Sequence, residues 1–466
     1  MSELKPIKRS WLADLKVYLE PPVVRMLLLG FSAGLPLLLV LGTLSYRLRE
    51  AGIDRTTIGF LSWVGLAYGF KWVWAPLVDS VPLPVLTRLL GRRRSWLLFA
   101  QTTLVLALLG MAVTDPSVDL HRLVAFALLA AFASATQDIA LDAFRIESAD
   151  QSRQAAMAAA YQVGYRIAMI STSAGALWIA AAFDPDEHSY QHMPWQVSYS
   201  VMALLMSVGI VTVLFSVEPT AGALAQSAEQ RRAVTARLQA GALPLAAARV
   251  LAWLYTTVCQ PFLDFVRHYR WQALLLLALI GTYRVSDIVL GVMSNPFYRD
   301  MGFTKDEVAA VSGVYGVVMT LTGSAIGGVL AVRLGVMRVL FLGALLSSVT
   351  NLLFAWLTTR GHDLSSLILV ISADNLSGGM ASAAFVGYLS GLTSVAYSAT
   401  QYALFSSIML LLPKFLAGFS GWAVDHYGYP AFFFGTALLG VPVLALVWMA
   451  WRNGEKSGRE PVPATR

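Results

Sequence analysis

The sequence predicts an all-α integral membrane protein with twelve transmembrane helices in two bundles of six. Only 13% of the 466 residues are charged and 57% are hydrophobic, whereas a soluble globular domain carries about 25% charged residues. Nearly uncharged stretches of about 20 residues, the length that crosses a bilayer as a helix, recur along the chain. A polar, basic segment interrupts this pattern near the middle and separates six stretches from six.

The apolar stretches and the interruption define the expected organisation. The predicted spans are 23–46, 57–79, 95–113, 121–144, 154–182, 195–216, 271–295, 307–331, 336–358, 365–390, 394–423 and 430–451. The first bundle is expected over residues 1–216 and the second over 271–452, with a linker at 217–270 and a tail at 453–466.

The linker changes character along its length. Its first part, "AGALAQSAEQRRAVTARLQAGALP", is small, polar and basic. In the following "RVLAWLYTTVCQPFLDFVRHYR", polar residues recur at helical spacing: Arg249, Thr256, Gln260, Asp264 and Arg267. This pattern predicts an amphipathic helix on the membrane surface. The alternative, a thirteenth span, would reverse the orientation of every later helix.

The distribution of Lys and Arg predicts the orientation. In the predicted topology 23 of the 34 basic residues lie on one side and 7 on the other, where the loop "DPDEH" is acidic. Cytoplasmic segments carry the excess of Lys and Arg, so both termini are expected in the cytoplasm. Contact with anionic lipid then accounts for the net charge of +7 without nucleic acid. The charged N-terminus does not resemble a cleavable signal peptide, and the single cysteine, Cys259, excludes an internal disulfide.

The predicted spans contain eight charged side chains that are not assigned to either membrane surface. The cations are Lys71, Arg166, Arg284 and Lys414, and the acids are Asp138, Asp142, Asp287 and Asp374. Charged groups at membrane depth are costly, so each is a candidate functional residue. The alternative is that they form ion pairs whose only role is to hold helices together.

Depth along the helices predicts which of these charges meet. With a rise of about 1.5 Å per residue, Lys71 and Asp138 lie at similar depth and are expected to pair across helices 2 and 4. Arg284 and Asp287 are three residues apart, so they are expected to pair along helix 7. Asp142 has two possible roles, as a proton carrier or, paired with Arg145, as a gate.

The residue types exclude several kinds of chemistry. All six histidines lie in or beside predicted loops, so no span offers a His-based metal site or a Ser-His pair. No G-x-x-x-x-G-K-[ST] motif for ATP occurs, and "SADN" at 372–375 lacks the glycine-flanked pattern of an intramembrane aspartyl protease. Six plus six helices with buried charges indicate a secondary transporter without a metal or other cofactor.

Several motifs carry a family resemblance. After helix 2, "WAPLVDS" and "LLGRRRSW" supply an acid, a glycine and a basic cluster. They resemble the loop between helices 2 and 3 of the major facilitator superfamily, with an insertion between the acid and the glycine. Longer stretches resemble the AmpG muropeptide permease family: "GFSAGLPLLLVLGTL", "TIGFLSWVGLAYGFKWVWAPLVD", "ASATQDIALDAFRIE", "GYRIAM", "YRVSDIVL", "NLSGGMASAAFVGYLSGL" and "SATQYALFSS".

The resemblance implies a major facilitator fold and a function. The expected protein is a monomeric, proton-driven importer in the bacterial inner membrane. Its cargo would be N-acetylglucosaminyl-1,6-anhydro-N-acetylmuramyl peptides, released when peptidoglycan is turned over. The alternative is a transporter of the same fold for another cargo, such as small peptides or acyl-coenzyme A. A membrane-bound enzyme and a receptor or scaffold are less favoured.

The candidate site residues follow from residue chemistry and from this resemblance. Expected proton-coupling residues are Asp138, Asp142, Asp287 and Asp374. Arginines can clamp carboxylates, while amides and phenols can bind substrate amides and hydroxyls; the expected substrate-binding residues are Gln137, Tyr161, Gln162, Tyr165, Arg166, Arg284, Asn375 and Gln401. Ion-pair or gate roles are assigned to Lys71, Asp79, Gly91, Arg92, Arg93, Arg94 and Arg145. Trp63 and Trp178 are either sugar-stacking residues or packing residues.

Overall fold

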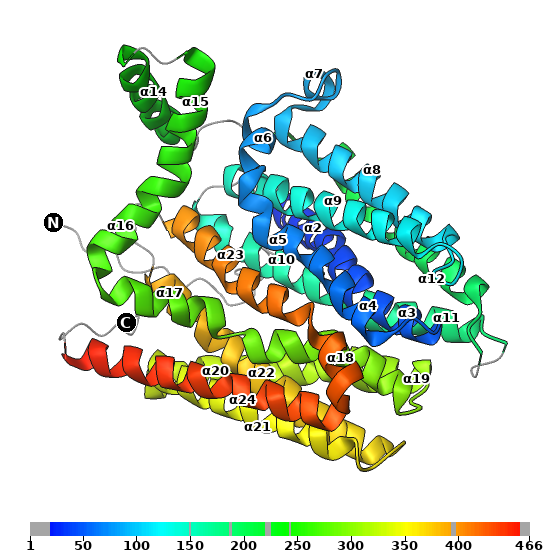
Figure 1. Ribbon diagram of the computed structural model, residues 1–466. Helices are drawn as coiled ribbons and strands as arrows, with labels where there is room; N and C mark the ends of the chain where they lie inside the picture. Colours follow the sequence, from blue (N-terminus) through cyan, green and yellow to red (C-terminus); the bar gives the residue numbers. More distant parts are fainter. Residues whose placement is uncertain are drawn as a thin grey trace, which may run out of the picture.

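The computed structural model describes residues 19–148, 151–185, 189–219, 225–241, 244–392 and 398–456. Within these ranges the secondary structure is helical and contains no strand. The predicted all-α class and the two six-helix bundles are confirmed (Figure 1).

Six rods cross the first bundle, and four of them consist of successive helical segments. The rods are α2–η2–α3 (Pro21–Leu38, Leu39–Thr43 and Leu44–Glu50), α4–η3–α5–η4–α6 (Arg55–Leu61, Ser62–Gly65, Leu66–Phe70, Lys71–Val73 and Ala75–Ser80), α8 (Arg92–Val113), α9 (Leu120–Glu147), α10–η5–α11 (Gln151–Ile170, Ser171–Gly175 and Ala176–Ala182) and α12–α13 (His192–Leu205 and Ser207–Leu214). A short helix, α7 (Leu86–Leu90), lies in the loop before α8.

The second bundle repeats the arrangement. Its rods are α17–α18 (Gln272–Thr282 and Val285–Asp300), α19–η7–α20 (Lys305–Val308, Ala309–Tyr315 and Gly316–Leu334), α21 (Val336–Leu357), α22 (Leu364–Leu392), α23 (Ser398–Ala417) and α24 (Ser420–Lys456). Helix α24 is broken at Gly428, whose φ of +78° is a conformation that side chains disfavour. The last membrane-crossing segment therefore starts after this glycine.

Nine described helices are long and apolar enough to cross a membrane. The other predicted spans depart from a continuous apolar helix for visible reasons. Span 57–79 is divided by the two 3-10 segments η3 and η4. Span 154–182 carries the polar residues of α10 and the π-helical η5, and the apolar part of span 394–423 is shortened to Leu404–Ala417.

The linker holds two helical units instead of the one predicted. Helix α15 (Leu245–Leu254), η6 (Tyr255–Cys259) and α16 (Gln260–Tyr269) cover the predicted amphipathic segment. The preceding α14 (Ala225–Ala240) was not predicted, because its sequence has no apolar stripe. Figure 1 shows α14 beside α15, away from the two bundles.

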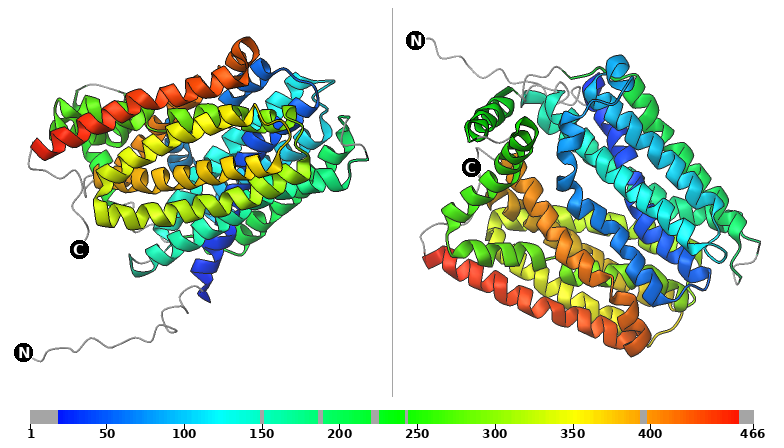
Figure 2. Two further views of the ribbon diagram at one scale, coloured as in Figure 1. Left: turned by 90° about the horizontal axis from the view of Figure 1, so that it is seen from below. Right: turned by 45° about the horizontal axis from the view of Figure 1, so that its top comes forward.

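The two bundles meet at one end of the molecule and diverge toward the other (Figures 1 and 2). We call the end where the bundles meet the closed end, and the opposite end, where α7 and α14 lie, the divergent end. One apolar core cluster includes residues of both bundles, such as Leu44 and Phe297, whereas two others stay within one bundle each. Burial of apolar surface therefore joins the bundles on the closed side.

Glycines allow backbones to touch at the closed end. A Cβ atom at Gly421 of α24 would lie 1.5 Å from the carbonyl oxygen of Arg55, and one at Gly59 of α4 would lie 2.7 Å from that of Gly418. No side chain fits in these gaps, so small residues set the helix separation.

Candidate functional site

The break in the second rod places Lys71 against α9. Pro76 lies in the first turn of α6 and has no N–H with which to continue the preceding helix. Lys71 lies in the short η4 segment just before it, and its Nζ is 3.9 Å from Oδ2 of Asp138. The predicted pair is therefore present, with about a quarter of each side chain exposed (26% and 22%).

Asp142 pairs along its own helix. Nη2 of Arg145 lies 3.4 Å from Oδ1 of Asp142, whose side chain is 54% exposed. The structure thus contains the alternative pair with Arg145. Asp142 lies one turn beyond Asp138, toward the divergent end of α9.

Gln137 lies inside the first bundle and does not line the space between the bundles. It is fully buried, and its Nε2 donates to Oγ of Ser32 at 3.3 Å. Gln101 donates to the same hydroxyl, so the amides join α2, α8 and α9. In this conformation the contacts of Gln137 are those of a structural residue, which differs from its predicted role in binding substrate.

The four expected substrate-binding residues of α10 form a polar stripe that is partly accessible. Tyr161, Tyr165 and Arg166 are half-buried and Gln162 is exposed. The rings of Tyr161 and Tyr165 lie 6.1 Å apart. Among the described residues no carboxylate pairs with Arg166, whose Nη1 contacts Sδ of Met169 at 3.7 Å. Its charge is thus available for a ligand.

The stripe is held in place by close packing of α10 on α2. A Cβ atom at Gly164 would lie 1.9 Å from the carbonyl oxygen of Leu27, and one at Gly30 would lie 2.2 Å from that of Tyr161. The two backbones are therefore in contact.

A second charged group lies in the other bundle. Arg284 stands at the break between α17 and α18, where its ψ of 6° departs from helical geometry. Its Nε is 3.4 Å from Oδ2 of Asp287, as predicted, and its Nη1 donates to Ser382 of α22 at 2.5 Å. Asp287 also accepts a hydrogen bond from Ser347 of α21.

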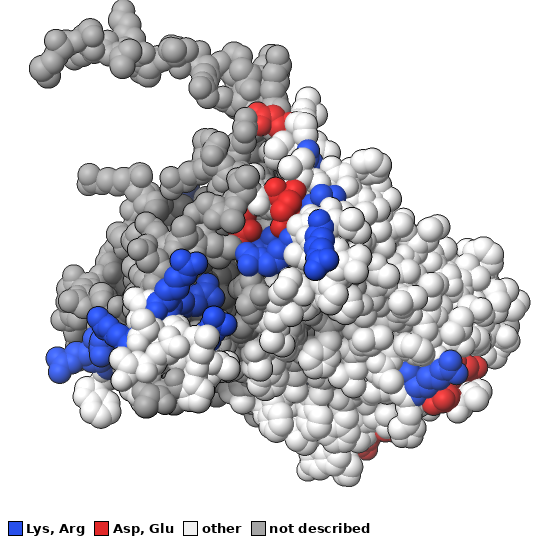
Figure 3. Space-filling model, turned by 90° about the horizontal axis from the view of Figure 1, so that it is seen from above, with Lys and Arg blue, Asp and Glu red and all other residues white. Residues whose placement is uncertain are grey.

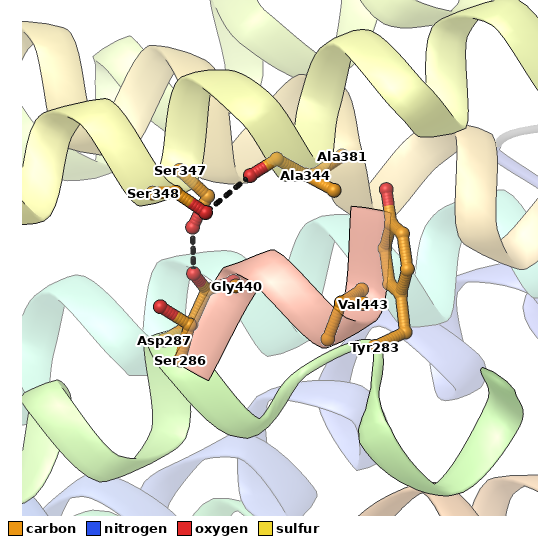
Figure 4. Close-up of a pocket in the computed structure, with 9 residues that line it drawn as sticks. All are labelled: Tyr283, Ser286, Asp287, Ala344, Ser347, Ser348, Ala381, Gly440 and Val443. Atoms are coloured by element: carbon orange, nitrogen blue, oxygen red, sulfur yellow. Dashed lines mark hydrogen bonds between the residues drawn. The ribbon is translucent and has the colours of Figure 1, made fainter. Parts of the chain in front are cut away.

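A small pocket adjoins Asp287 (Figure 4). Figure 4 shows the Asp287 carboxylate of α18 directed toward Ser347, with Gly440 of α24 and Tyr283 nearby. Asp374 of α22 accepts from Thr350 at 3.3 Å. The second bundle therefore holds two carboxylates, Asp287 and Asp374, and one guanidinium in a hydroxyl-rich network.

Two amide residues of the second bundle, Asn375 and Gln401, are expected to bind substrate, and the structure describes the side chain of the first. Asn375 receives a hydrogen bond from Thr320 at 2.9 Å and donates to the carbonyl of Ile371 at 3.1 Å, so its amide already has partners in α20 and α22. Gln401 lies in α23, and its side chain is outside the described part of the structure.

The loop before α8 and the first turn of α8 bind the ends of two other helices of the first bundle. The guanidinium of Arg93 lies 2.7 Å from Glu147 at the end of α9, and both side chains are buried. The backbone N–H groups of Arg93 and Arg94 donate to Glu218, and an acid at a helix N-terminus is favoured. The Arg94 side chain donates to the carbonyl groups of Val213 and Leu214.

Gly91 and its neighbours complete this loop. Gly91 has a φ of +86°, and a Cβ atom there would lie 2.5 Å from the Glu218 side chain, so a glycine is needed. Arg92 is the first residue of α8 and is half-buried. The side chain of Asp79 lies outside the described residues. Figure 3, viewed from the side of α7, shows Lys and Arg side chains gathered on this face.

Ion pairs cross between the bundles at the closed end. Lys305 of α19 lies 2.6 Å from Glu50 of α3 and also contacts Asp184, and all three side chains are at most 3% exposed. Trp195 Nε1 donates to Glu50 at 2.6 Å. The closed end thus contains a buried ammonium held by two carboxylates of the other bundle. We call Lys305, Glu50 and Asp184 the buried latch.

A second, more exposed group of charges flanks the buried latch. Asp300 of α18 pairs with Arg49 at 2.5 Å and with Arg55 at 2.8 Å, and Tyr429 donates to it at 2.7 Å. Arg55 also lies 3.1 Å from Asp425. These contacts join α3 and α4 of the first bundle to α18 and α24 of the second.

Comparison with known proteins identifies the family. The family model of the Major Facilitator Superfamily matches residues 26–285 and 275–466. The putative transporter AmpG 4 of Rickettsia felis is 31% identical over 93% of this chain and 97% of its own length. The anhydromuropeptide permease of Escherichia coli K12 is 32% identical over 93% of this chain and 80% of its own. This chain belongs to the AmpG family of the major facilitator superfamily.

Solved structures agree on the fold of this AmpG-family chain. A D-xylose–proton symporter superposes with a TM-score of 0.66 at 12% identity, covering 92% of this chain and 97% of its own. A peptide transporter gives a TM-score of 0.63 at 12% identity, covering 96% and 97%. The AmpG-family chain is therefore a multi-pass membrane transporter by family and fold.

The two tryptophans considered for sugar stacking occupy different places in this AmpG-family fold. The ring of Trp63 stacks on Phe415 with centroids 5.8 Å apart, and its Nε1 donates to the Phe415 carbonyl at 2.9 Å. It also packs on Phe60 and Phe419, so it seals the bundle interface in this conformation. Trp178 is 42% exposed on the surface of α11.

Sequence reasoning missed most of the residues that join the bundles. Glu50, Asp184 and Lys305 were assigned to the loops outside the predicted spans. Glu147 and Glu218, which bind the start of α8 and do not join the bundles, were not singled out either. One available signal was "TKDE" at 304–307, a helix start in which Thr304 and Glu307 form a capping box. It places Lys305 on a rigid first turn. Among the described residues, no group of three or more His, Cys, Asp or Glu side chains is arranged to hold a metal ion.

Proposed function

We propose that this transporter imports N-acetylglucosaminyl-1,6-anhydro-N-acetylmuramyl peptides from the periplasm to the cytoplasm, driven by protons. The observation that carries the cargo is the similarity to the Escherichia coli anhydromuropeptide permease along 93% of the chain. A muropeptide carries sugar hydroxyls, amides and carboxylates. The half-buried tyrosines of α10 offer matching groups, and so does Arg166, which pairs with no carboxylate among the residues that the structure describes.

The proposed orientation puts the divergent end in the cytoplasm. That end carries Arg92, Arg93 and Arg94 at the start of α8, and basic residues favour the cytoplasmic side. The structure then corresponds to an inward-facing state of alternating access, sealed toward the periplasm by the buried latch and the pairs around Asp300. Transport requires these contacts to separate so that the periplasmic side opens.

Proton coupling is proposed to use the paired carboxylates in the spans. Protonation of Asp138 would remove the charge that holds Lys71, and protonation of Asp287 would do the same for Arg284. Each proton would bind from the periplasm and leave to the cytoplasm as access alternates. The freed Lys71 or Arg284 would then be able to attract a substrate carboxylate.

The decisive test is uptake of labelled anhydro-muropeptide into proteoliposomes, with and without an inward proton gradient. Accumulation above the equilibrium level only with the gradient is expected. Unlabelled small peptides and acyl-coenzyme A serve as competitors, and stronger competition by either would favour the alternative cargo. Equal accumulation with and without the proton gradient would contradict proton coupling but not the cargo assignment.

In cells, the proposal predicts where turnover products go. A strain lacking this protein should release anhydro-muropeptides into the medium instead of recycling them. Normal retention in a strain with no second permease would contradict the cargo assignment.

A further inference from the structure

We propose that Lys414 binds a carboxylate of the transported substrate in the seam between the two bundles. This inference rests on the proposed function and adds a residue to which the sequence assigned no role beyond its charge. Lys414 lies in α23, three residues before the helix ends at Ala417.

The side chain of Lys414 points from the second bundle toward the first. Its Nζ lies 5.8 Å from the ring centroid of Tyr68 in α5. A Cβ atom at Gly65 would lie 2.5 Å from the same Nζ. The ammonium therefore fills the space that a side chain at position 65 would take, and it contacts the first bundle directly.

Lys414 lies next to the aromatic seal of the closed end. The carbonyl of Phe415, the following residue, accepts the hydrogen bond from Trp63, and Phe419 packs on the same indole. Helix α23 runs toward the closed end, so Phe415, and Phe419 just after the end of the helix, lie beyond Lys414. A ligand that enters from the divergent end would meet Lys414 before this seal.

No anion neutralises Lys414 among the described residues. Its only described partner is the face of Tyr68. The intramembrane carboxylates already have other partners: Asp138 contacts Lys71, Asp287 contacts Arg284 and Ser347, and Asp374 contacts Thr350. An unpaired ammonium in a span is costly, and a substrate carboxylate would relieve that cost while bridging both bundles.

The contact with the Tyr68 ring leaves the Lys414 ammonium able to bind an anion. A cation over an aromatic face is attracted to the ring, yet the ring supplies no negative charge. The ammonium keeps its donor capacity for a carboxylate. Lysine, a compact point charge, suits a single carboxylate oxygen, whereas Arg166 offers a planar fork. The two cations therefore are expected to take different carboxylates of one ligand.

The test compares two ligands on purified full-length variants. The probes are an anhydro-muropeptide with free peptide carboxylates and the same molecule with these carboxylates amidated. Lys414→Met should weaken binding of the free acid by about tenfold to a hundredfold, the range expected for a hydrogen bond to a charged group. It should leave the affinity for the amidated ligand within about twofold. Lys414→Arg should retain part of the discrimination.

Two further variants separate a binding role from a folding role. Gly65→Ala leaves the charge in place but displaces the ammonium, so it should reduce the affinity for the free acid more than for the amide. Leu412→Ala changes an exposed residue on the same helix (42% exposed) and should bind both ligands like the wild type. Thermal stability of Lys414→Met in detergent should not fall below that of the wild type, because an unpaired charge is removed.

The outcomes distinguish this inference from the proposed function. Suppose that the wild type binds the free acid, and that Lys414→Met either weakens binding of both ligands equally or changes neither affinity. Lys414 then does not bind a carboxylate, and the cargo assignment stands. If the wild type binds neither muropeptide, the proposed function is wrong and this inference is wrong with it.

Discussion

Nζ of Lys305 lies 2.6 Å from Oε1 of Glu50, and the two residues belong to different bundles. Asp184 contacts the same ammonium, and Trp195 donates to Glu50. The bundles cannot separate at the closed end without removing Lys305 from both carboxylates. The energy of this contact therefore contributes directly to the balance between the two access states.

Removing the ammonium should favour opening of the closed end. Lys305→Met leaves two buried carboxylates without their cation, and breaking a buried pair costs about 3–5 kcal/mol. We expect spin labels at Val118 and Thr359, one in each bundle, to move apart and to populate a longer distance. Pulsed electron–electron double resonance measures the distance between the two labels. The variants carry Cys259→Ser, since Cys259 is the single cysteine of the chain.

The conservative variant controls for the charge. Lys305→Arg keeps a cation at the same place and should preserve most of the short distance. An unchanged distance distribution in Lys305→Met would show that the buried latch does not set the access state.

A steric change at the same end should act without altering any charge. In Gly421→Ala the new methyl group would lie 1.5 Å from the Arg55 carbonyl oxygen, so α4 and α24 must separate. We expect the same shift in label distance and a lower rate of transport. Gly435→Ala is the matched control, because the space around that glycine of α24 is empty within 4 Å. Equal behaviour of the two variants would show that the contact is not tight.

The pairs within the spans could be predicted from the sequence. A helix rises by a fixed amount per residue, so the predicted depth in the membrane is similar for Lys71 and Asp138. The spacing of Arg284 and Asp287 along one helix places them on one face. Both pairs occur in the structure. Covalent geometry and helix periodicity were sufficient for these contacts.

The contacts between the bundles could not be predicted in the same way. Lys305 and Glu50 are separated by more than half the length of the chain, and their contact depends on how two rigid bodies dock and on which access state is populated. Gln137 illustrates a related limit. Helical spacing shows on which face of a helix a polar residue lies, but not whether this face borders a cavity or a neighbouring helix. The side chain of Gln137 contacts Ser32 of a neighbouring helix.

Neutral replacements of the span carboxylates test proton coupling. Asp138→Asn and Asp287→Asn each keep the shape of the side chain and remove its titratable proton. At least one should abolish proton-driven accumulation in proteoliposomes while leaving measurable binding of the muropeptide. Wild-type accumulation by both variants would exclude these two acids as coupling residues and leave Asp142 and Asp374 to be tested.

Arg166 is expected to recognise a substrate carboxylate through its planar fork. Arg166→Lys keeps the positive charge but loses the bidentate geometry. It should weaken binding of muropeptides with free carboxylates by about tenfold or more and spare an amidated ligand. Isothermal titration with both ligands measures the difference. An equal loss for both ligands would indicate that Arg166 has a structural role.

A mutant cycle on Lys71 and Asp138 tests whether their contact stabilises the first bundle. At 3.9 Å the two groups form an ion pair between η4 and α9. Removing one member of a fully buried pair costs about 3–5 kcal/mol; with 26% and 22% of the side chains exposed, water screens the remaining charge and the loss should be smaller.

The double variant decides whether that pair exists in solution. Lys71→Met with Asp138→Asn removes both charges, so it should be more stable than either single variant, and transport should still fail if Asp138 carries the proton. Thermal stability of the four proteins in detergent gives the coupling energy. Strictly additive losses would show that the two residues do not interact. Asp142, one turn away on the same helix and paired here with Arg145, would then be the first partner of Lys71 to examine.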